Sequence, residues 1–321
     1  MFLGLEIAKA QFLAALMMDH KYKTKAFDNT SSGFDQLWVW LQRLDATTAR
    51  ACMEATGSYG EALATFLVDH GVEVSVVNPA RVKSYAQSEG LRTKNDRVDA
   101  RLIARFCQSM QNKLELWQPA PVEVRELRAL VRRYETLIAM RTQEKNRLEA
   151  NPPASIIESI QEHLGYLNAQ IAKTEQAIRQ HIDQHPKLRK QNDLLQSIPG
   201  IGNTTSALLL AEVQFDQYRS ARQVAAHAGL TPKHRESGAS VKGRPRLSKI
   251  GSARLRKGLY LPALAAIRHN PLLAAFADRL TLAGKCKMSI IAAVMRKMLH
   301  IAFGVLKSGQ PFNPEFHPSN S

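Results

Sequence analysis

The chain has 321 residues, of which 44 are Lys or Arg and 28 are Asp or Glu, so its formal net charge at pH 7 is +16. This excess of positive charge favours polyanions such as nucleic acids as partners. With 45% hydrophobic residues the chain can bury substantial cores, which excludes intrinsic disorder as its main state.

The first part of the chain is predicted to be a mixed α/β domain that spans residues 1–115. Short apolar runs bounded by turn residues predict strands, and apolar residues at helical spacing predict helices. The predicted strands are 2–7, 12–17, 22–27, 49–53 and 72–77, and the predicted helices are 33–43, 59–70, 80–87 and 95–110. The first three strands should form an antiparallel meander. The full order predicts a mixed sheet covered by helices.

Residues 116–190 are predicted to form a helical hairpin. Apolar residues recur in its second half at spacings of three, four and seven, which is typical of a coiled coil: Ile157, Ile160, Leu164, Leu167, Ile171 and Ile178. The sequence Asn151-Pro152-Pro153 should break the first helix and turn the chain back. Such an apolar seam can pair within the chain or with another subunit. We favour oligomerisation, as a dimer or a tetramer.

Residues 191–321 are predicted to be a mostly helical domain around a Gly- and Arg-rich loop at 231–251. Residues 201–321 carry 18 basic and 5 acidic side chains, whereas residues 1–100 carry 11 and 12. The last third is therefore the predicted polyanion-binding region.

The expected absence of targeting signals and the spacing of the cysteines favour a cytoplasmic protein. Residues 1–18 are apolar, but they lack a basic leading segment and contain Glu6 and Lys9, which argues against a signal peptide. No other run is expected to approach the length of about 18 apolar residues that a membrane helix needs. Cys52, Cys107 and Cys286 lie far apart, with neither zinc spacing nor a disulfide framework.

Four carboxylates are predicted at strand ends and a helix start, which is where the active sites of α/β sheets are usually found. Glu6 and Glu54 end predicted strands, and Asp96 and Asp99 open a predicted helix, three residues apart and thus on one face. Oxygen donors without nearby His or Cys favour Mg²⁺, and two such ions can stabilise the attacking and leaving oxygens of a phosphoryl displacement. The alternative is that Asp96 caps its helix and Asp99 stabilises the first turn.

Two segments of the last third could contact phosphates. Residues 197–202 have the form of a helix-hairpin-helix turn, in which Gly200 and Gly202 would let backbone amides approach a phosphate; a structural turn between packed helices is the alternative. Between residues 233 and 257, nine basic residues face one acid, Glu236. The predicted phosphate contacts there are Lys233, Arg235, Lys242, Arg244, Arg246 and Lys249. Such a loop is usually a solvated surface, yet Ser237 and Ser240 lie among these cations and either hydroxyl could approach a phosphodiester.

These pieces occur together, in this order, in one family. The chain resembles the insertion-sequence transposases with a DEDD motif, which include the Piv-type DNA invertases and the bridge-RNA-guided recombinases. The residues that carry the resemblance are 2–9, 54–57, 78–80, 87–92, 94–100, 197–202, 228–232, 236–238 and 247–249.

The resemblance implies a fold, a site and partners. The front domain should be RuvC-like, an RNase H-type fold, with a Mg²⁺-binding tetrad of Glu6, Glu54, Asp96 and Asp99. Ser237 should be the nucleophile that attacks the scissile phosphate, leaving a phosphoserine link. The acidic group of one subunit should meet the serine of another, on double-stranded donor and target DNA and with a structured noncoding RNA as guide. The family normally has Asp where Glu6 stands, so the metal site could be shifted or inactive.

Other readings remain open from the sequence. A RuvC-like junction-resolving nuclease would share the acidic tetrad and use water in place of the serine. A catalytically silent nucleic-acid-binding subunit would follow if Glu6 abolished metal binding. A sugar-kinase-like ATPase is disfavoured because Ile7-Ala8-Lys9 replaces the phosphate-binding turn expected after the first carboxylate. The resemblance also implies a bacterial, nucleoid-associated location.

Overall fold

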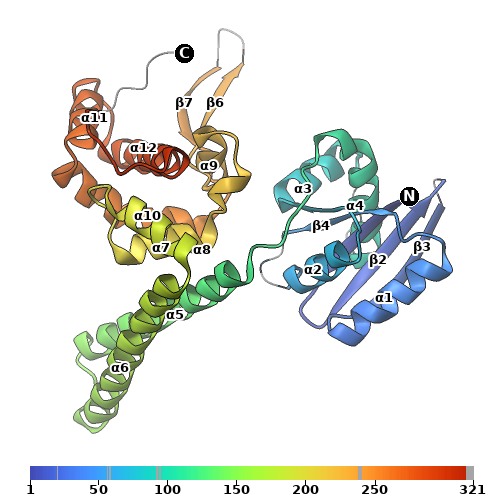
Figure 1. Ribbon diagram of the computed structural model, residues 1–321, viewed down its shortest axis with the longest axis horizontal. Coiled ribbons are helices and arrows are strands. Elements are labelled where there is room, and N and C mark those ends of the chain that lie inside the picture. Colours follow the sequence, from blue (N-terminus) through green and yellow to red (C-terminus); the bar gives the residue numbers. More distant parts are fainter. Residues whose placement is uncertain are drawn as a thin grey trace. The chain divides into compact units, whose positions relative to one another are not determined.

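The computed structural model describes residues 1–19, 21–55, 57, 59–91, 93, 95–237 and 241–315, and for residues 234–237 and 241–245 the backbone alone. The chain divides into two compact units, Met1–Pro119 and Ala120–Ser321, here called unit 1 and unit 2 (Figure 1). Each unit has its own buried hydrophobic clusters.

Unit 1 is built on a five-stranded sheet in the order β3-β2-β1-β4-β5. β1, β2 and β3 are antiparallel neighbours, and β4 and β5 continue the sheet parallel to β1. The predicted meander and mixed sheet are thus confirmed. The elements in chain order are β1 (Phe2–Ile7), β2 (Gln11–Met18), β3 (Lys21–Asp28), α1 (Ser31–Arg43), β4 (Arg50–Glu54), α2 (Glu61–Asp69), β5 (Val74–Val77), α3 (Pro79–Ser88), α4 (Asp96–Met110) and a short 3₁₀ helix (Gln111–Lys113).

Helices cover both faces of this sheet. Leu3 and Leu5 of β1 pack in one cluster with Leu37 of α1 and Leu63 of α2. A second cluster joins the sheet to α3 and α4 on the other face, through residues such as Cys52, Val82, Ile103 and Phe106. Successive residues of a strand point to opposite faces, so even-numbered positions of β1 face α4.

Unit 2 begins with a helical hairpin and continues as a mostly helical domain. Its elements are α5 (Val122–Glu149), α6 (Ala154–Gln184), α7 (Pro186–Gln196), α8 (Asn203–Glu212), a 3₁₀ helix (Phe215–Gln217), α9 (Ala221–His227), β6 (Pro232–Ser237), β7 (Val241–Leu247), α10 (Ala253–His269), α11 (Pro271–Leu282) and α12 (Lys287–Ser308). Asn151, with a positive φ of 52°, and the two prolines after it separate α5 from α6, as predicted.

The apolar seam of α6 is used within the chain. Leu167 and Ile171 of α6 form a buried cluster with Leu137 of α5. Farther along the hairpin, Ile178 packs with Val131 of α5 in the main core of unit 2. Exposed apolar side chains remain on the hairpin, at Met140, Ile156 and Tyr166.

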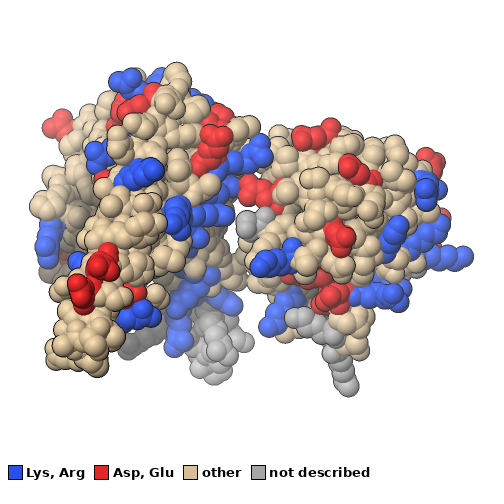
Figure 2. All heavy atoms as spheres, turned by 90° about the horizontal axis from the view of Figure 1, so that it is seen from below, with Lys and Arg blue, Asp and Glu red and all other residues tan. Residues whose placement is uncertain are grey.

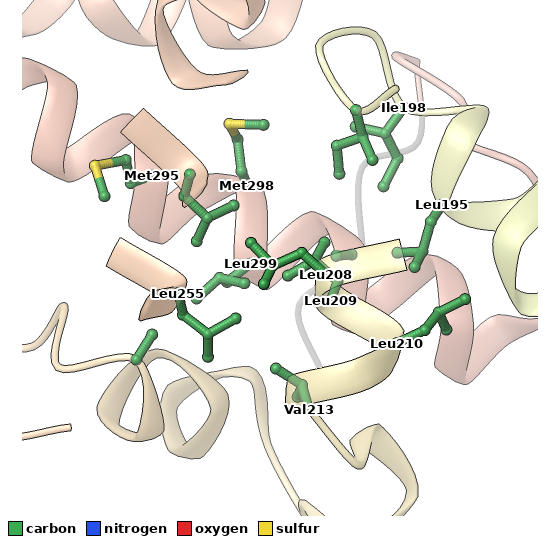
Figure 3. Packing of buried hydrophobic residues seen from close by; sticks show 14 of the residues in the cluster. Leu195, Ile198, Leu208, Leu209, Leu210, Val213, Leu255, Met295, Met298 and Leu299 are labelled. Carbon is green, nitrogen blue, oxygen red and sulfur yellow. The ribbon is translucent and has the colours of Figure 1, made fainter. Parts of the chain in front are cut away.

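The main core of unit 2 surrounds α8, whose residues Thr205–Ala211 are all buried. Figure 3 shows Leu208 and Leu209 of this helix among Leu255 of α10 and Leu299 of α12. By length and composition alone, α12 could cross a membrane. In this respect the sequence expectation of no membrane-length apolar segment does not hold. The apolar face of α12 lies in this core, which accounts for its composition.

The predicted loop at 231–251 is wrong in part, because β6 and β7 form an antiparallel hairpin there. The sequence pattern does not reveal these strands. Residues 232–237 are polar or charged apart from Pro232, so they lack the apolar alternation by which a strand on a core is recognised. Backbone pairing defines the hairpin instead.

Candidate functional site

Glu6 and Glu54 lie side by side near the carboxyl ends of two neighbouring parallel strands. The last paired residues of β1 and β4 are Leu5 and Met53, so the two glutamates are the next residues on each strand. The strands of such a pair run about 5 Å apart. Gly4 on β1 and Cys52 on β4 face α4. Glu6 and Glu54 come two residues after them on the same strands. Both carboxylates therefore point to the α4 face of the sheet.

α4 packs directly on this part of the sheet. A Cβ atom on Gly4 would lie 2.1 Å from the carbonyl oxygen of Ala100 and 2.4 Å from the amide nitrogen of Ala104. Cys107 of α4 meets Cys52 of β4, and this thiol–thiol hydrogen bond, together with burial, raises the pKa of Cys52. Only glycine at position 4 lets the helix approach the strand so closely.

Asp96 and Asp99 occupy the first turn of α4. Asn95 caps the helix, because its side-chain oxygen accepts a hydrogen bond from the Val98 amide at 2.9 Å. The alternative in which Asp96 is the cap is therefore wrong. Asp99 is half-buried and Asp96 is exposed. Asp96 lies one helical turn before Ala100, and Asp99 one turn before Ile103. Ala100 and Ile103 are both buried, so both aspartates lie on the sheet-facing side of the helix.

The four carboxylates are the kind of ligand that Mg²⁺ prefers, but their side chains do not converge on one point as they would around a bound ion. All four groups supply the hard oxygen ligands that Mg²⁺ prefers. Two of them are neighbours on the sheet, and the other two open the helix that packs on the same face. Within the part of the chain that the structure describes, however, no three His, Cys, Asp or Glu side chains form a group that could hold a metal ion.

The predicted nucleophile ends a strand in unit 2. Ser237 is the last residue of β6, and its backbone pairs with Val241 at the start of β7. It therefore belongs to the last described pair of the hairpin, at the end opposite Pro232 and Leu247. Residues 238–240, with Ser240 among them, lie outside the described residues, as does the position of the Ser237 side chain.

The base of the hairpin is fixed to the core of unit 2. Leu230 before β6 is fully buried, and Leu247 of β7 packs against the main core. The Arg256 guanidinium of α10 donates hydrogen bonds to the carbonyl oxygens of Ala228 at 3.0 Å and Gly251 at 3.1 Å, one on each side of the hairpin. Sequence reasoning counted Arg256 only as one of nine basic residues. Its hydrogen bond to Gly251 spans five residues and its hydrogen bond to Ala228 spans 28, and neither leaves a signal in the local sequence pattern.

Two cations face each other across the hairpin. Lys233 of β6 pairs in register with Arg246 of β7, and both side chains are exposed. Like charges directly opposite each other destabilise a strand pair unless an anion lies between or beside them. Lys249 is also exposed and adopts a positive φ of 54°. The side chains of Arg235, Lys242 and Arg244 lie outside the described part, although their backbones belong to the strands. Figure 2 shows a run of Lys and Arg side chains on unit 2.

The two glycines of the predicted phosphate-binding turn differ in their surroundings. Gly200, with φ of 101°, lies against α10, because a Cβ atom there would come within 2.6 Å of the Ala266 Cβ. Helix packing therefore accounts for Gly200. Gly202 is exposed at the N-terminus of α8, and no atom lies within 4 Å of the position of its missing Cβ. Of the two, Gly202 has the open backbone that a phosphate contact requires.

Comparison with known proteins finds relatives over nearly the whole chain. Residues 3–151 match a transposase family of the DEDD IS110 type, and residues 192–278 match the transposase IS116/IS110/IS902 family. The chain is 32% identical over 320 residues to a pilin gene-inverting protein of Moraxella bovis, covering 98% of both chains. A pilin gene-inverting protein of Moraxella lacunata matches equally well. The transposase for insertion sequence element IS1328 of Yersinia enterocolitica is 24% identical over 245 residues, 65% of this chain and 69% of that protein.

Proposed function

The chain belongs to the IS110-type family of DEDD transposases, and from this membership and the geometry above we propose that it cleaves and rejoins DNA strands as a recombinase. The observation that carries the proposal is the register of β1 and β4, which makes Glu6 and Glu54 neighbours on the sheet face covered by the Asp99-bearing helix. The relatives named for inverting pilin genes match from end to end, which supports action on DNA segments within a larger molecule.

The acidic residues form the metal-binding part of the proposed site. Glu6, Glu54, Asp96 and Asp99 would hold Mg²⁺. When bound, the metal would stabilise negative charge on the attacking and leaving oxygens of a phosphoryl transfer. Unit 1 supplies a rigid support, because the carboxylates stand on two core strands and on a helix packed against them. Glu at position 6, where the family normally has Asp, places its carboxylate one methylene farther from the strand.

Ser237 is the proposed nucleophile. Its hydroxyl oxygen forms a bond to the scissile phosphorus while the bond to the departing deoxyribose oxygen breaks. The serine proton leaves, and the departing oxygen takes up a proton. In the rejoining step the hydroxyl of a new strand end attacks the phosphoserine and releases the serine, so the number of phosphodiester bonds is conserved. A serine hydroxyl is a weak nucleophile at neutral pH and therefore depends on the acidic site for activation.

The proposed assembly contains more than one copy of the chain. Following the family, the acidic group of one subunit acts with the serine of another in a dimer or tetramer. The exposed apolar residues of the hairpin, including Ile156 and Tyr166, are available for such a contact. A structured noncoding RNA is the proposed guide, which would leave sequence choice to base pairing and the protein to bind phosphates. The proposed location is the bacterial cytoplasm, at the nucleoid.

A covalent adduct is the decisive observation. Wild-type protein is mixed with end-labelled DNA, the element's noncoding RNA and Mg²⁺, and the products are separated on a denaturing gel. We expect a protease-sensitive band of protein joined to DNA. Ser237→Ala should bind nucleic acid but give no such band, and the matched control Ser240→Ala should still give it.

Two outcomes would contradict the proposal. Cleavage by wild-type protein without any protein-linked band would favour a nuclease that uses water. An undiminished band from Ser237→Ala would place the nucleophile elsewhere. If neither cleavage nor adduct forms while nucleic acid still binds, the silent binding subunit becomes the better description.

A further inference from the structure

A large cavity lies within unit 2, beside the base of the β6–β7 hairpin. It has a volume of about 760 Å³ and is lined by residues at the ends of the hairpin and by α11 and α12. Figure 1 shows β7, α11 and α12 grouped on this side of unit 2. The volume lies within the range of about 300–1,000 Å³ typical of small-molecule and cofactor sites.

Part of the cavity wall is apolar and includes one phenyl ring. Leu230, Phe276, Leu280 and Ala293 contribute to its wall. Phe276 belongs to α11 and is only partly buried, and the Arg279 guanidinium lies over its ring at 5.3 Å from the centroid. An apolar wall with an aromatic ring suits a flat ring system such as a nucleobase.

The cavity wall also carries positive charge. Arg246 of β7, Lys285 before α12, and Arg296 and Lys297 on α12 all line it. No acidic side chain occurs among the described residues that do so. A ligand of this site should therefore combine an apolar flat part with negative charge.

His300 adds a polar group to the wall. Its Nε2 atom is buried and has no hydrogen-bond partner among the described residues. The pKa of His300 is lowered mainly by burial and further by the positive charges of Arg296, Lys297 and Arg222. Its ring is therefore neutral at pH 7.

We propose that this cavity binds one unpaired base of a nucleic-acid strand, with the neighbouring phosphates on Arg246, Lys285, Arg296 and Lys297. The inference rests on the proposed function only for the class of substrate, a nucleic acid. A base within a duplex has its edge and faces occupied, so only an unpaired or extruded base can enter. The site selects a nucleotide by shape and stacking.

The cavity lies on the strand that carries the proposed nucleophile. Pro232, which lines it, and Ser237 are the first and last residues of β6, five steps of about 3.4 Å apart, or about 17 Å. A base held here therefore belongs to the stretch of nucleic acid next to the proposed cleavage point. Holding that base would keep a strand in place while its neighbours are exchanged.

The test compares three labelled 20-bp probes: a fully paired DNA duplex, the same duplex with one bulged adenine, and the same bulge with an abasic nucleotide. Binding of the full chain is measured by fluorescence anisotropy in EDTA. We expect the adenine bulge to bind about tenfold more tightly than the abasic bulge, the effect of about 1.4 kcal/mol of stacking. The same bulges in RNA duplexes show which strand type the site prefers.

Two variants remove the site in different ways. Ala293→Phe fills the cavity, and Phe276→Leu keeps apolar volume but removes the ring. Both should reduce the tenfold preference to about twofold or less while leaving affinity for the paired duplex unchanged. Ala275→Phe, at an exposed position of the same helix that does not line the cavity, is the matched control and should keep the preference.

The proposal is overturned if wild-type protein shows no preference for the adenine bulge, or if Phe276→Leu, with a wild-type unfolding curve, retains it. It is also overturned if a poly-glutamate peptide, and not the bulged adenine, competes through the cavity, which would make the site one for acidic proteins. Because binding is measured without metal, absence of a serine–DNA adduct in the earlier experiment leaves this result unaffected.

Discussion

The acidic residues of unit 1 and the cationic residues of unit 2 are supported in different ways. Glu6, Glu54 and Asp99 belong to two strands and a helix that are packed into hydrophobic cores, so side-chain packing fixes the positions of these elements. The β6–β7 hairpin extends from the core of unit 2. Among the contacts that the structure describes, Leu247 packs on this core, the two strands pair through their backbones, and Arg256 bonds to the backbone on either side of the hairpin.

This difference suggests a division of tasks. A metal site needs carboxylates held to within tenths of an ångström, which a sheet and a tightly packed helix provide. A surface that binds a polyanion tolerates variation in position, because Coulomb attraction acts over several ångströms. Substitutions that disturb packing should therefore harm the acidic site, whereas single substitutions in the cationic surface should have graded effects.

The largest effect is expected from Asp99→Asn. The change keeps the size of the side chain but removes its charge, so strand exchange should fall by about 100- to 1,000-fold, the scale seen when one charge-stabilising group is lost. Nucleic-acid affinity should stay within about twofold of wild type. The measurement is recombinant product formed under Mg²⁺, with anisotropy for binding. Glu6→Asp is the paired variant and should retain or raise activity. Wild-type recombination by Asp99→Asn would remove the acidic site from the mechanism.

Gly4→Ala should be the next most damaging change. Its Cβ would lie 2.1 Å from the Ala100 carbonyl, so α4 must move off β1, at a cost of about 3 kcal/mol in the unfolding free energy. Denaturant unfolding measures the loss. Gly60→Ala is the control in the same unit, because its nearest atom is the flexible Met53 side chain at 3.3 Å. Equal stability of the two variants would contradict the close packing of α4.

Much of unit 1 could be predicted from the sequence. Its strands are apolar runs separated by turn residues, and α4 starts at an Asn cap followed by an amphipathic stretch, all of which are local signals. The adjacency of Glu6 and Glu54 could not be read directly. It depends on the pairing of β1 with β4, which are more than 40 residues apart in the chain.

The hairpin and its support were harder to predict. Residues 232–247 carry charges and glycines in place of an apolar alternation, so their composition resembles a loop. Arg256 resembles its basic neighbours, although it donates to two backbone carbonyls, and Gly200 resembles a phosphate-binding glycine, although it packs on Ala266. Apart from the Arg256–Gly251 hydrogen bond, which spans five residues, the decisive contacts in these cases join residues that are distant in sequence.

Arg256→Ala should loosen the hairpin without unfolding unit 2. Two hydrogen bonds from a charged donor to backbone carbonyls are lost, which we expect to lower the local stability of β6 and β7 by about 2 kcal/mol. Amide hydrogen exchange in residues 232–247 would report this as faster exchange. Lys257→Ala, the exposed neighbour, should leave exchange unchanged. Identical exchange in both variants would mean that Arg256 does not support the hairpin.

Arg246→Ala should have a smaller and more uniform effect. Removing one cation of the proposed phosphate-binding surface should weaken binding similarly for all sequences and reduce the slope of log affinity against log salt by about one. Titrations at several salt concentrations give the slope. Arg43→Ala, which removes an exposed cation at the end of α1 in unit 1, should leave it unchanged. A loss limited to one base position would indicate base reading by Arg246.

The smallest expected effect is a pH dependence of stability that originates at His300. Burial and the neighbouring cations lower its pKa in the folded chain below the ordinary value of 6.5, so the unfolded chain binds the proton more readily. Stability should therefore be highest at neutral pH and decrease as the pH falls from about 6.5 toward the lower folded pKa. His300→Gln should reduce the slope of this part of the curve, as measured by thermal unfolding between pH 7 and pH 5, while His227, whose pKa is also lowered by burial, keeps its own contribution. His269→Gln, which removes an exposed histidine at the end of α10, is the control. A curve for His300→Gln as steep as that of wild type would show that other groups cause the acid sensitivity.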